Sequence, residues 1–360
     1  MKRLQDYIVE ADLTTITDFI QDKVDHPKDN EKTLKKMYNV ANEDIAKQIK
    51  DWSDKEKFFS VDQRRCIHAI FNDYDQTDAL LDIIQNPNDL VDPQEILNNT
   101  KSTLLEIIKN SKIVKDHNIE DDMIKELMDT QPGQGGVTVG PAEIALMIFV
   151  QGCKQNNKKA KEKPELTDEE DAESIGSDLI MGNGNYVEVK GREAMFCGQK
   201  NKPQAKVVLS ELEKININLE GTTDTSKGNK YLLSKFDEKN NEEFIKSFCD
   251  CFNEYYSQSK YFDDWKNLVL TDVCKETKNR MQKLFISISL WGLMEYQATE
   301  KFNNILLINT KKSSYPFVNI SFNDKLTLSE LYKNFKDRLH TPNAIKNASR
   351  KELPKITLVK

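Results

Sequence analysis

The sequence predicts a mixed α/β protein of the α+β type, in which a small mixed sheet is flanked by helices and extended by large all-helical segments. Two patterns predict this class. Apolar residues recur at three- and four-residue steps through residues 1–128 and 242–301, as expected of amphipathic helices. Short apolar runs with strand-type residues occur at 178–191, 304–309 and 317–322, which is typical of strands.

The composition suits a sizeable core under a heavily charged surface. Of the 360 residues, 38% are hydrophobic and 31% charged, and the net charge is −7. This charge does not indicate a nucleic-acid-binding protein, although the 52 lysines and arginines can still cluster on one face. No apolar run reaches the ~20 residues that span a bilayer, no signal peptide is apparent, and the six cysteines are scattered. We therefore expect a cytoplasmic protein with reduced thiols and no membrane partner, with virion association as the alternative location.

Residues 1–128 are expected to form a helical N-terminal domain. Prolines fall among Asp and Asn between the apolar repeats, which suits interhelical loops, and Asp92–Glu95 has the composition of a helix start. Three histidines are spread over this segment, and surface or interhelical packing is favoured over a metal or catalytic role for His26, His68 and His117.

A glycine-rich segment at 131–137 interrupts the helical pattern and precedes an almost wholly apolar helix at 139–150. Pro141 suits the first turn of that helix. Glu143 is its one charged residue, and two explanations stay open for it. Its carboxylate is either stabilised by the helix dipole or held for chemistry. Residues 154–174 lack apolar periodicity and are expected to be a solvated loop or flap.

The most informative stretch is a predicted hairpin in which Asp178 opens the first strand and Glu188-x-Lys190 closes the second. The turn lies at Gly182–Asn185. Period-two alternation places Glu188 and Lys190 on one face of their strand, and the intervening valines pack on the other. The turn folds Asp178 back towards them, and a third strand is expected at 194–198.

These residue types point to metal-assisted hydrolysis. Two carboxylates, a main-chain carbonyl and waters satisfy the octahedral oxygen shell of Mg²⁺, with Mn²⁺ able to take its place. A lysine beside the ion can orient the attacking water, help to deprotonate it or stabilise developing charge. The competing explanation is a cross-strand ion pair between exposed hairpin charges. Acid-x-Lys also occurs by chance in polar or helical context, at Asp237-x-Lys239, Asp264-x-Lys266 and Glu276-x-Lys278.

The C-terminal half is expected to be mostly helical, with two further strands. The aromatic stripe between Phe244 and Tyr256 is favoured as core over a base-stacking platform. The expected elements are helices at 207–219, 242–280, 281–301 and 327–338, strands at 304–309 and 317–322, and an extended tail over the last twenty residues.

This order of elements resembles the PD-(D/E)XK nuclease superfamily, whose restriction-endonuclease-like core runs helix, three strands, helix, strand. The resemblance covers 137–209 and 281–322. It departs from the pattern in two places: Gly176–Ser177 precedes Asp178 where the motif has proline, and 210–280 is inserted between core elements. The site that the resemblance implies consists of Asp178 and Glu188 as metal ligands, Glu143 as an additional acid and ligand, and Lys190 as the motif lysine.

The resemblance implies a Mg²⁺-dependent nuclease that hydrolyses DNA, of a restriction or virus-encoded type, with RNA as an open alternative substrate. A second class stays open: a catalytically inactive nuclease-like interaction protein or virion-associated structural protein. In either class the helical domains are expected to serve a homodimer or another protein partner. The expected divisions are 1–128, 129–209, 210–280, 281–322 and 323–360.

Overall fold

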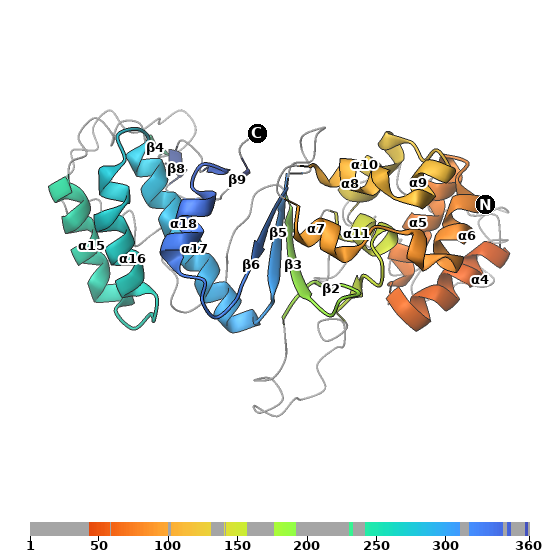
Figure 1. Cartoon of the computed structure of the whole chain (residues 1–360), viewed down its shortest axis with the longest axis horizontal. Coiled ribbons are helices and arrows are strands. Elements are labelled where there is room, and N and C mark those ends of the chain that lie inside the picture. The colour runs from red at the N-terminus through yellow and green to blue at the C-terminus, as the bar shows by residue number, and fades with distance from the viewer. Residues whose placement is uncertain are drawn as a thin grey trace, which may run out of the picture. The chain divides into compact units, whose positions relative to one another are not determined.

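The computed structural model describes residues 43–57, 59–99, 102–130, 140, 142–156, 176–191, 230–232, 242–309, 317–340, 344–346 and 357–358. These residues form many α-helices and a five-stranded sheet, so the predicted α+β class is confirmed at this level (Figure 1). None of the helices described is long and apolar enough to cross a bilayer. The predicted glycine-rich segment, third strand and first C-terminal helix, at 131–137, 194–198 and 207–219, lie outside the described residues.

The chain divides into two compact units. The first comprises 1–167, 178–189 and 310–315, and the second comprises 168–177, 190–309 and 316–360. The strand that carries Glu188 and Lys190 therefore begins in the first unit and ends in the second.

The described part of the first unit begins with short helices, as predicted. Two of them start with capping boxes, formed by Ser60 with Gln63 and by Thr103 with Glu106. The helix start predicted at 92–95 is present, with Asp92 as N-cap. The elements are α4 (Glu43–Trp52), η1 (Ser53–Lys57), α5 (Val61–Asp73), α6 (Thr77–Gln85), η2 (Pro87–Asp89), α7 (Pro93–Leu97), α8 (Leu104–Asn110), α9 (Lys112–Asp116) and α10 (Asp121–Asp129).

The apolar helix predicted before the hairpin is α11 (Glu143–Phe149), and every one of its residues is buried. It packs on α10, which turns four fully buried side chains into the core, those of Met123, Ile124, Leu127 and Met128. The residue after α11, Val150, forms a parallel bridge with Val91. This bridge attaches the end of α11 to the helical segment that precedes it by some sixty residues.

The five strands lie in the order β1-β2-β3-β5-β6. Neighbours are antiparallel from β1 (Lys154–Gln155) through β2 (Leu179–Ile180) to β3 (Tyr186–Gly191), and again between β5 (Asn304–Ile308) and β6 (Phe317–Ser321). All of β5 is buried. The last two strands and their helix-then-strand order confirm the prediction for 281–322.

One expectation for this region is wrong. The lack of an apolar pattern predicts a solvated loop at Lys154 and Gln155, yet these residues form the first strand of the sheet. Backbone hydrogen bonds to β2 hold them there, and backbone pairing does not depend on side-chain polarity. Hydrophobic periodicity therefore could not reveal this strand.

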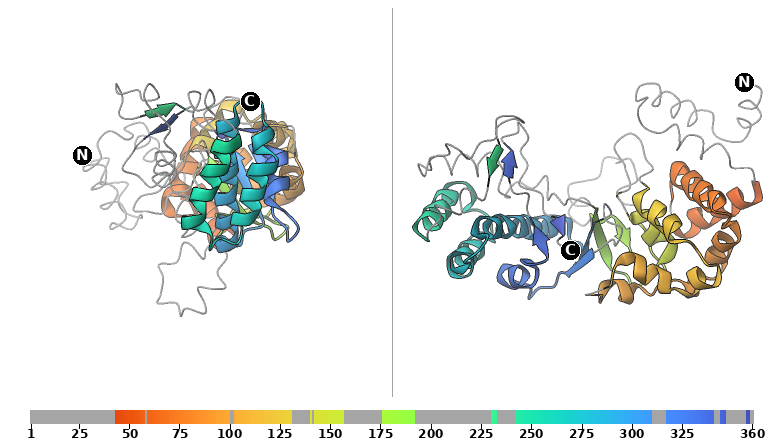
Figure 2. Two further views of the ribbon diagram at one scale, coloured as in Figure 1. Left: turned by 90° about the vertical axis from the view of Figure 1, so that its left-hand side faces the viewer. Right: turned by 90° about the horizontal axis from the view of Figure 1, so that it is seen from above.

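The second unit is built on the helices α15 (Glu242–Tyr256), α16 (Phe262–Thr271) and α17 (Arg280–Glu300), which lie side by side (Figure 1, Figure 2). A 3₁₀ turn, η3 (Val273–Lys275), joins the last two, and α18 (Leu328–Phe335) packs on α16 and α17. Two small antiparallel pairs complete it: β4 (Lys230–Leu232) with β8 (Ala344–Lys346), and β7 (Leu339–His340) with β9 (Thr357–Leu358).

An aromatic cluster forms the core between α15, α16 and α17. The stacked indoles of Trp265 and Trp291 lie 5.0 Å apart between ring centroids, and Phe252 lies 5.4 Å from Trp265. Phe248, Phe252 and Tyr256 are all buried, which confirms the predicted core role of the stripe at these three positions. Tyr255 differs, since 46% of it is exposed.

Both indole N–H groups of this cluster have acceptors, as buried polar groups require. Trp265 Nε1 donates to Ser287 Oγ at 3.0 Å. Trp291 Nε1 donates to Ser259 Oγ at 3.0 Å, and the same hydroxyl donates to the buried carboxylate of Glu295. The network ties the turn before α16 to the centre of α17.

Phe252 and Tyr255 offer a matched test of this core. We expect Phe252→Ala to lower the free energy of unfolding of the second unit by about 3–5 kcal/mol, because the truncation leaves a cavity among fully buried rings. Tyr255→Ala on the same helix should change it by no more than about 1 kcal/mol. Urea titration followed by the fluorescence of Trp265 and Trp291 measures both, and equal losses would contradict the assigned core.

Candidate active site

The predicted hairpin is present as β2 and β3, joined by a three-residue turn. Met181 N donates to Asn185 O at 3.0 Å, and Gly184 N donates to Met181 O at 2.8 Å. Gly184 has φ +82°, a conformation that glycine adopts at little cost. This turn is of the kind that sets hairpin register, and it pairs Leu179 with Val187.

The register brings Asp178 and Glu188 together. Continuing the pairing by one residue beyond Leu179 and Val187 places Asp178 directly opposite Glu188, and cross-strand partners project from the same face. Asp178 Oδ2 accepts a hydrogen bond from Val189 N at 3.0 Å, so its carboxylate lies on the Glu188–Lys190 stretch of β3. The predicted approach of Asp178 to this strand is thus observed.

Glu188 is fully buried, as are Val187 and Val189 on the opposite face. Glu188 is therefore not an exposed hairpin charge. Burial of a carboxylate is costly unless it is compensated, so a structure retains one in such a place for a structural or chemical reason.

Lys190 is half-buried and projects from the same strand face as Glu188, two residues further on. Its ammonium lies 5.7 Å from the centroid of the Tyr296 ring, on α17 of the second unit. Lys190 is therefore directed onto an aromatic face rather than extended into solvent.

Glu143 begins α11, and its Oε1 accepts a hydrogen bond from Gly140 N at 2.7 Å. This contact places the carboxylate at the positive end of the helix, as the dipole explanation requires. Among the described residues no group of three or more His, Cys, Asp or Glu side chains is arranged to hold a metal ion. The structure thus brings together Asp178 and Glu188, and gives Glu143 a capping contact at the start of α11.

The two opposed carboxylates fit a hard divalent cation. Mg²⁺ prefers oxygen ligands and keeps several waters, so two carboxylates with a main-chain carbonyl are a sufficient protein contribution. A cation between Asp178 and Glu188 would also offset their mutual repulsion. The donor set on this hairpin therefore suits Mg²⁺ or Mn²⁺.

Lys57 is a buried charge near this region that no sequence pattern singled out. It ends η1, donates to Cys153 O at 2.8 Å and lies 5.2 Å from the centroid of the Trp52 ring. Burial lowers the pKa of its amine. Burial also raises the pKa of the Cys153 thiol to about 12; the charge of Lys57 opposes that rise and the charge of Glu143 adds to it. Lys57 thus anchors the connection between α11 and β1.

A close glycine contact holds the hairpin against the end of α11. A Cβ added to Gly182 would come within 2.6 Å of Gln151 O, and one added to Gly152, which has φ +59°, within 2.6 Å of Gly182 Cα. The two turns therefore touch through their backbones. The position of the hairpin relative to α11 depends on the absence of side chains at both glycines.

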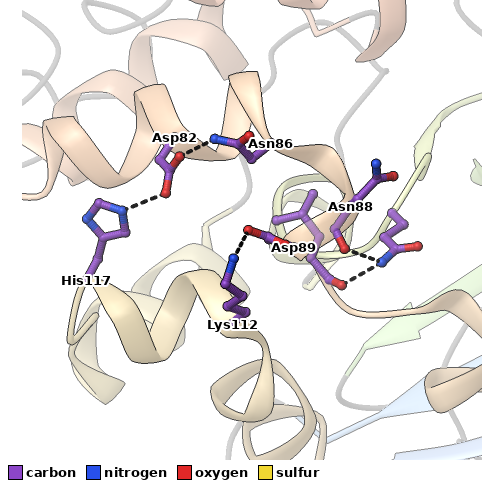
Figure 3. Close-up of polar contacts among 8 residues, drawn as sticks. Asp82, Asn86, Asn88, Asp89, Lys112 and His117 are labelled. Carbon is purple, nitrogen blue, oxygen red and sulfur yellow. Dashed lines mark hydrogen bonds and ion pairs between the residues drawn. The ribbon is translucent and has the colours of Figure 1, made fainter.

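Of the three N-terminal histidines, His68 is buried in α5 and His117 makes a polar contact, whereas His26 lies outside the described residues. His117 Nε2 lies 2.9 Å from Asp82 Oδ2, and Lys112 pairs with Asp89 at 2.6 Å (Figure 3). Burial lowers the pKa of His68, which lies in α5. Close by, Gln151 Nε2 donates to Asn88 O at 3.0 Å and to Leu90 O at 2.8 Å, so η2 is bound to the segment that follows α11.

No protein-family model, curated protein or solved structure matches this chain. The site is therefore assessed from its own geometry.

Gly182→Ala should lower the free energy of unfolding of the first unit by about 1–3 kcal/mol, because the added methyl group meets a backbone carbonyl that cannot move aside cheaply. The control is Gly184→Asn in the same turn. Nothing lies within 4 Å of a Cβ at Gly184, and asparagine tolerates positive φ. We expect the control substitution to lower the free energy of unfolding by no more than about 1 kcal/mol. Urea titration monitored by Trp52 fluorescence compares them, and an unaffected Gly182→Ala would refute the close contact.

The Asp82–His117 contact predicts a pH dependence of stability. The hydrogen bonds from His117 and Asn86 hold the pKa of Asp82 below its usual value. A lowered folded-state pKa contributes stability above the unfolded-state pKa and loses it as pH falls through the folded-state value. Wild type should therefore be more stable than Asp82→Asn at pH 6, with the difference shrinking towards pH 3. Thermal melts across this range measure it, with the exposed Asp51→Asn as control; a difference that grows on acidification would contradict the assignment.

Proposed function

We propose that this chain is a Mg²⁺-dependent nuclease that hydrolyses DNA phosphodiester bonds, of a restriction or virus-encoded type. The observation that carries the proposal is the pairing of Asp178 with the buried Glu188 on one face of a short hairpin, with Lys190 following on the same face. Two acids can hold a catalytic divalent cation, and a lysine beside them can orient the attacking water or stabilise developing charge.

The order of elements supports the same proposal. Helix α11, strands β1, β2 and β3, helix α17 and strand β5 follow one another in the order helix, three strands, helix, strand, once β4, α15, α16 and η3 are set aside as an insertion. This is the order that the resemblance to the PD-(D/E)XK superfamily implies. The Asp178 strand becomes the second of the three rather than the first, since β1 precedes it.

In the proposed reaction Asp178 and Glu188 would hold the cation. When bound, the ion supplies neutralisation of phosphate charge and lowers the pKa of a water molecule. Asp178 is oriented by the Val189 amide, so its carboxylate does not need to be ordered during binding. Lys190 would orient the attacking water or stabilise the negative charge that develops on the phosphate. Glu143, at the start of α11, would be the additional acid that the resemblance implies.

The test uses isosteric variants that retain the fold. Asp178→Asn keeps an oxygen acceptor for the Val189 amide but removes the charge, and Glu188→Gln keeps the buried shape. We expect these and Lys190→Met to lower Mg²⁺-dependent cleavage by at least about 100-fold, on linear, circular and single-stranded DNA and on RNA. Asp264→Asn, at the exposed acid of an acid-x-Lys sequence on α16, is the matched control and should retain full activity.

A second readout separates metal binding from turnover. Mg²⁺ or Mn²⁺ at about 100 times its Kd should stabilise wild type by about 2.7 kcal/mol, because it binds only the folded state. The stabilisation should disappear in Asp178→Asn and Glu188→Gln and persist in Lys190→Met. Full cleavage by any of the three site variants would refute the site assignment. Metal-dependent stabilisation without cleavage of any nucleic acid would favour the inactive nuclease-like interaction protein.

A further inference from the structure

An aromatic side chain of the second unit, to which Lys190 also belongs, lies under the Lys190 ammonium. Tyr296 is on α17, more than a hundred residues along the chain, and its ring centroid is 5.7 Å from Lys190 Nζ. This distance is within the ~6 Å over which an aromatic face attracts a cation. Tyr296 is only 9% exposed, so the contact is shielded from water and correspondingly stronger than at an open surface.

The Tyr296 ring is itself held in place from behind. Its centroid lies 5.3 Å from that of the fully buried Phe302, and Phe302 lies 5.5 Å from Phe322 in an edge-to-face arrangement. Gln297 Nε2 donates to Phe302 O at 3.1 Å, which closes the turn between α17 and β5. Three rings, those of Tyr296, Phe302 and Phe322, thus form a rigid support that ends at Lys190.

We propose that Tyr296 is a positioning residue for Lys190, an inference that rests on the nuclease function proposed above. A lysine side chain has four rotatable bonds and loses much rotamer freedom whenever it is ordered. The Tyr296 ring orders the ammonium before substrate arrives, so this cost does not fall on the reaction step. The ring acts through Lys190 and does not itself touch the reacting atoms.

The role belongs to the ring face and not to the phenol hydroxyl. Tyr296→Phe keeps the face that attracts the cation, whereas Tyr296→Leu removes it while retaining an apolar side chain. The two variants therefore separate positioning from simple core packing. Tyr255→Leu, which alters an exposed tyrosine of α15, is the control for nonspecific effects.

The first measurement does not depend on activity. Lysines of the full chain are methylated with ¹³C-formaldehyde, and the Lys190 methyl signal is assigned by its disappearance in Lys190→Arg. The ring current of the aromatic side chain at position 296 should move this signal upfield of the bulk lysine signals. We expect this shift in the wild type and in the variants Tyr296→Phe and Tyr255→Leu. In Tyr296→Leu it should return to the bulk position. A wild-type Lys190 signal at the bulk position would overturn the proposal, whether or not Tyr296→Leu folds.

The second measurement is the rate of Mg²⁺-dependent DNA cleavage. Tyr296→Leu should lower kcat about three- to thirtyfold with little change in KM, and Tyr296→Phe should restore it. Equal losses in Tyr296→Phe and Tyr296→Leu, or a change in KM alone, would overturn the positioning role. If wild type cleaves no nucleic acid while the methyl signal behaves as expected, the proposed function fails and the Lys190–Tyr296 contact stands.

Discussion

The register of the β2–β3 hairpin is the constraint on which the candidate site depends. The pairing of Leu179 with Val187 places Asp178 opposite Glu188, and a slip of one residue would move Glu188 to the other face of the sheet. The turn sets this register through Gly184, which supplies the positive φ that a three-residue loop requires. The Gly152–Gly182 contact then fixes the hairpin against the end of α11.

The burial of Glu188 distinguishes this hairpin from one that carries only surface charges. Acids and lysines on surface hairpins commonly contribute little to folding stability, because solvent screens their charges. Glu188 is instead fully buried, and the strand register places the half-buried Asp178 opposite it, an arrangement that a divalent cation would stabilise. Two features support the proposed nuclease function: the two carboxylates on this hairpin, and the order of the helices and strands around them. The Tyr296 ring beside Lys190 gives a physical reason why the ammonium is held in place.

The helical part of the first unit supports the hairpin indirectly. Val91 bridges Val150, Gln151 donates to the carbonyls of Asn88 and Leu90, and Lys57 donates to Cys153 O. These contacts converge on the four residues between α11 and β1. The helices thereby hold the segment from which the sheet begins, and this gives a structural reason for a large helical domain beside a small sheet.

The sequence by itself determined the elements whose signals are local. Periodicity located α11, α17, β5 and β6, and glycine with asparagine located the hairpin turn, because side-chain spacing and backbone conformation are properties of neighbouring residues. Only the tertiary structure decided what depends on distant residues. Strand β1 is held by backbone bonds to β2, and Glu143 accepts a hydrogen bond from Gly140 N. Lys57 is buried, although its neighbours Asp54, Lys55 and Glu56 are charged and exposed. Burial and pairing of this kind arise when segments far apart in the chain exclude water from one another, and no local pattern encodes them.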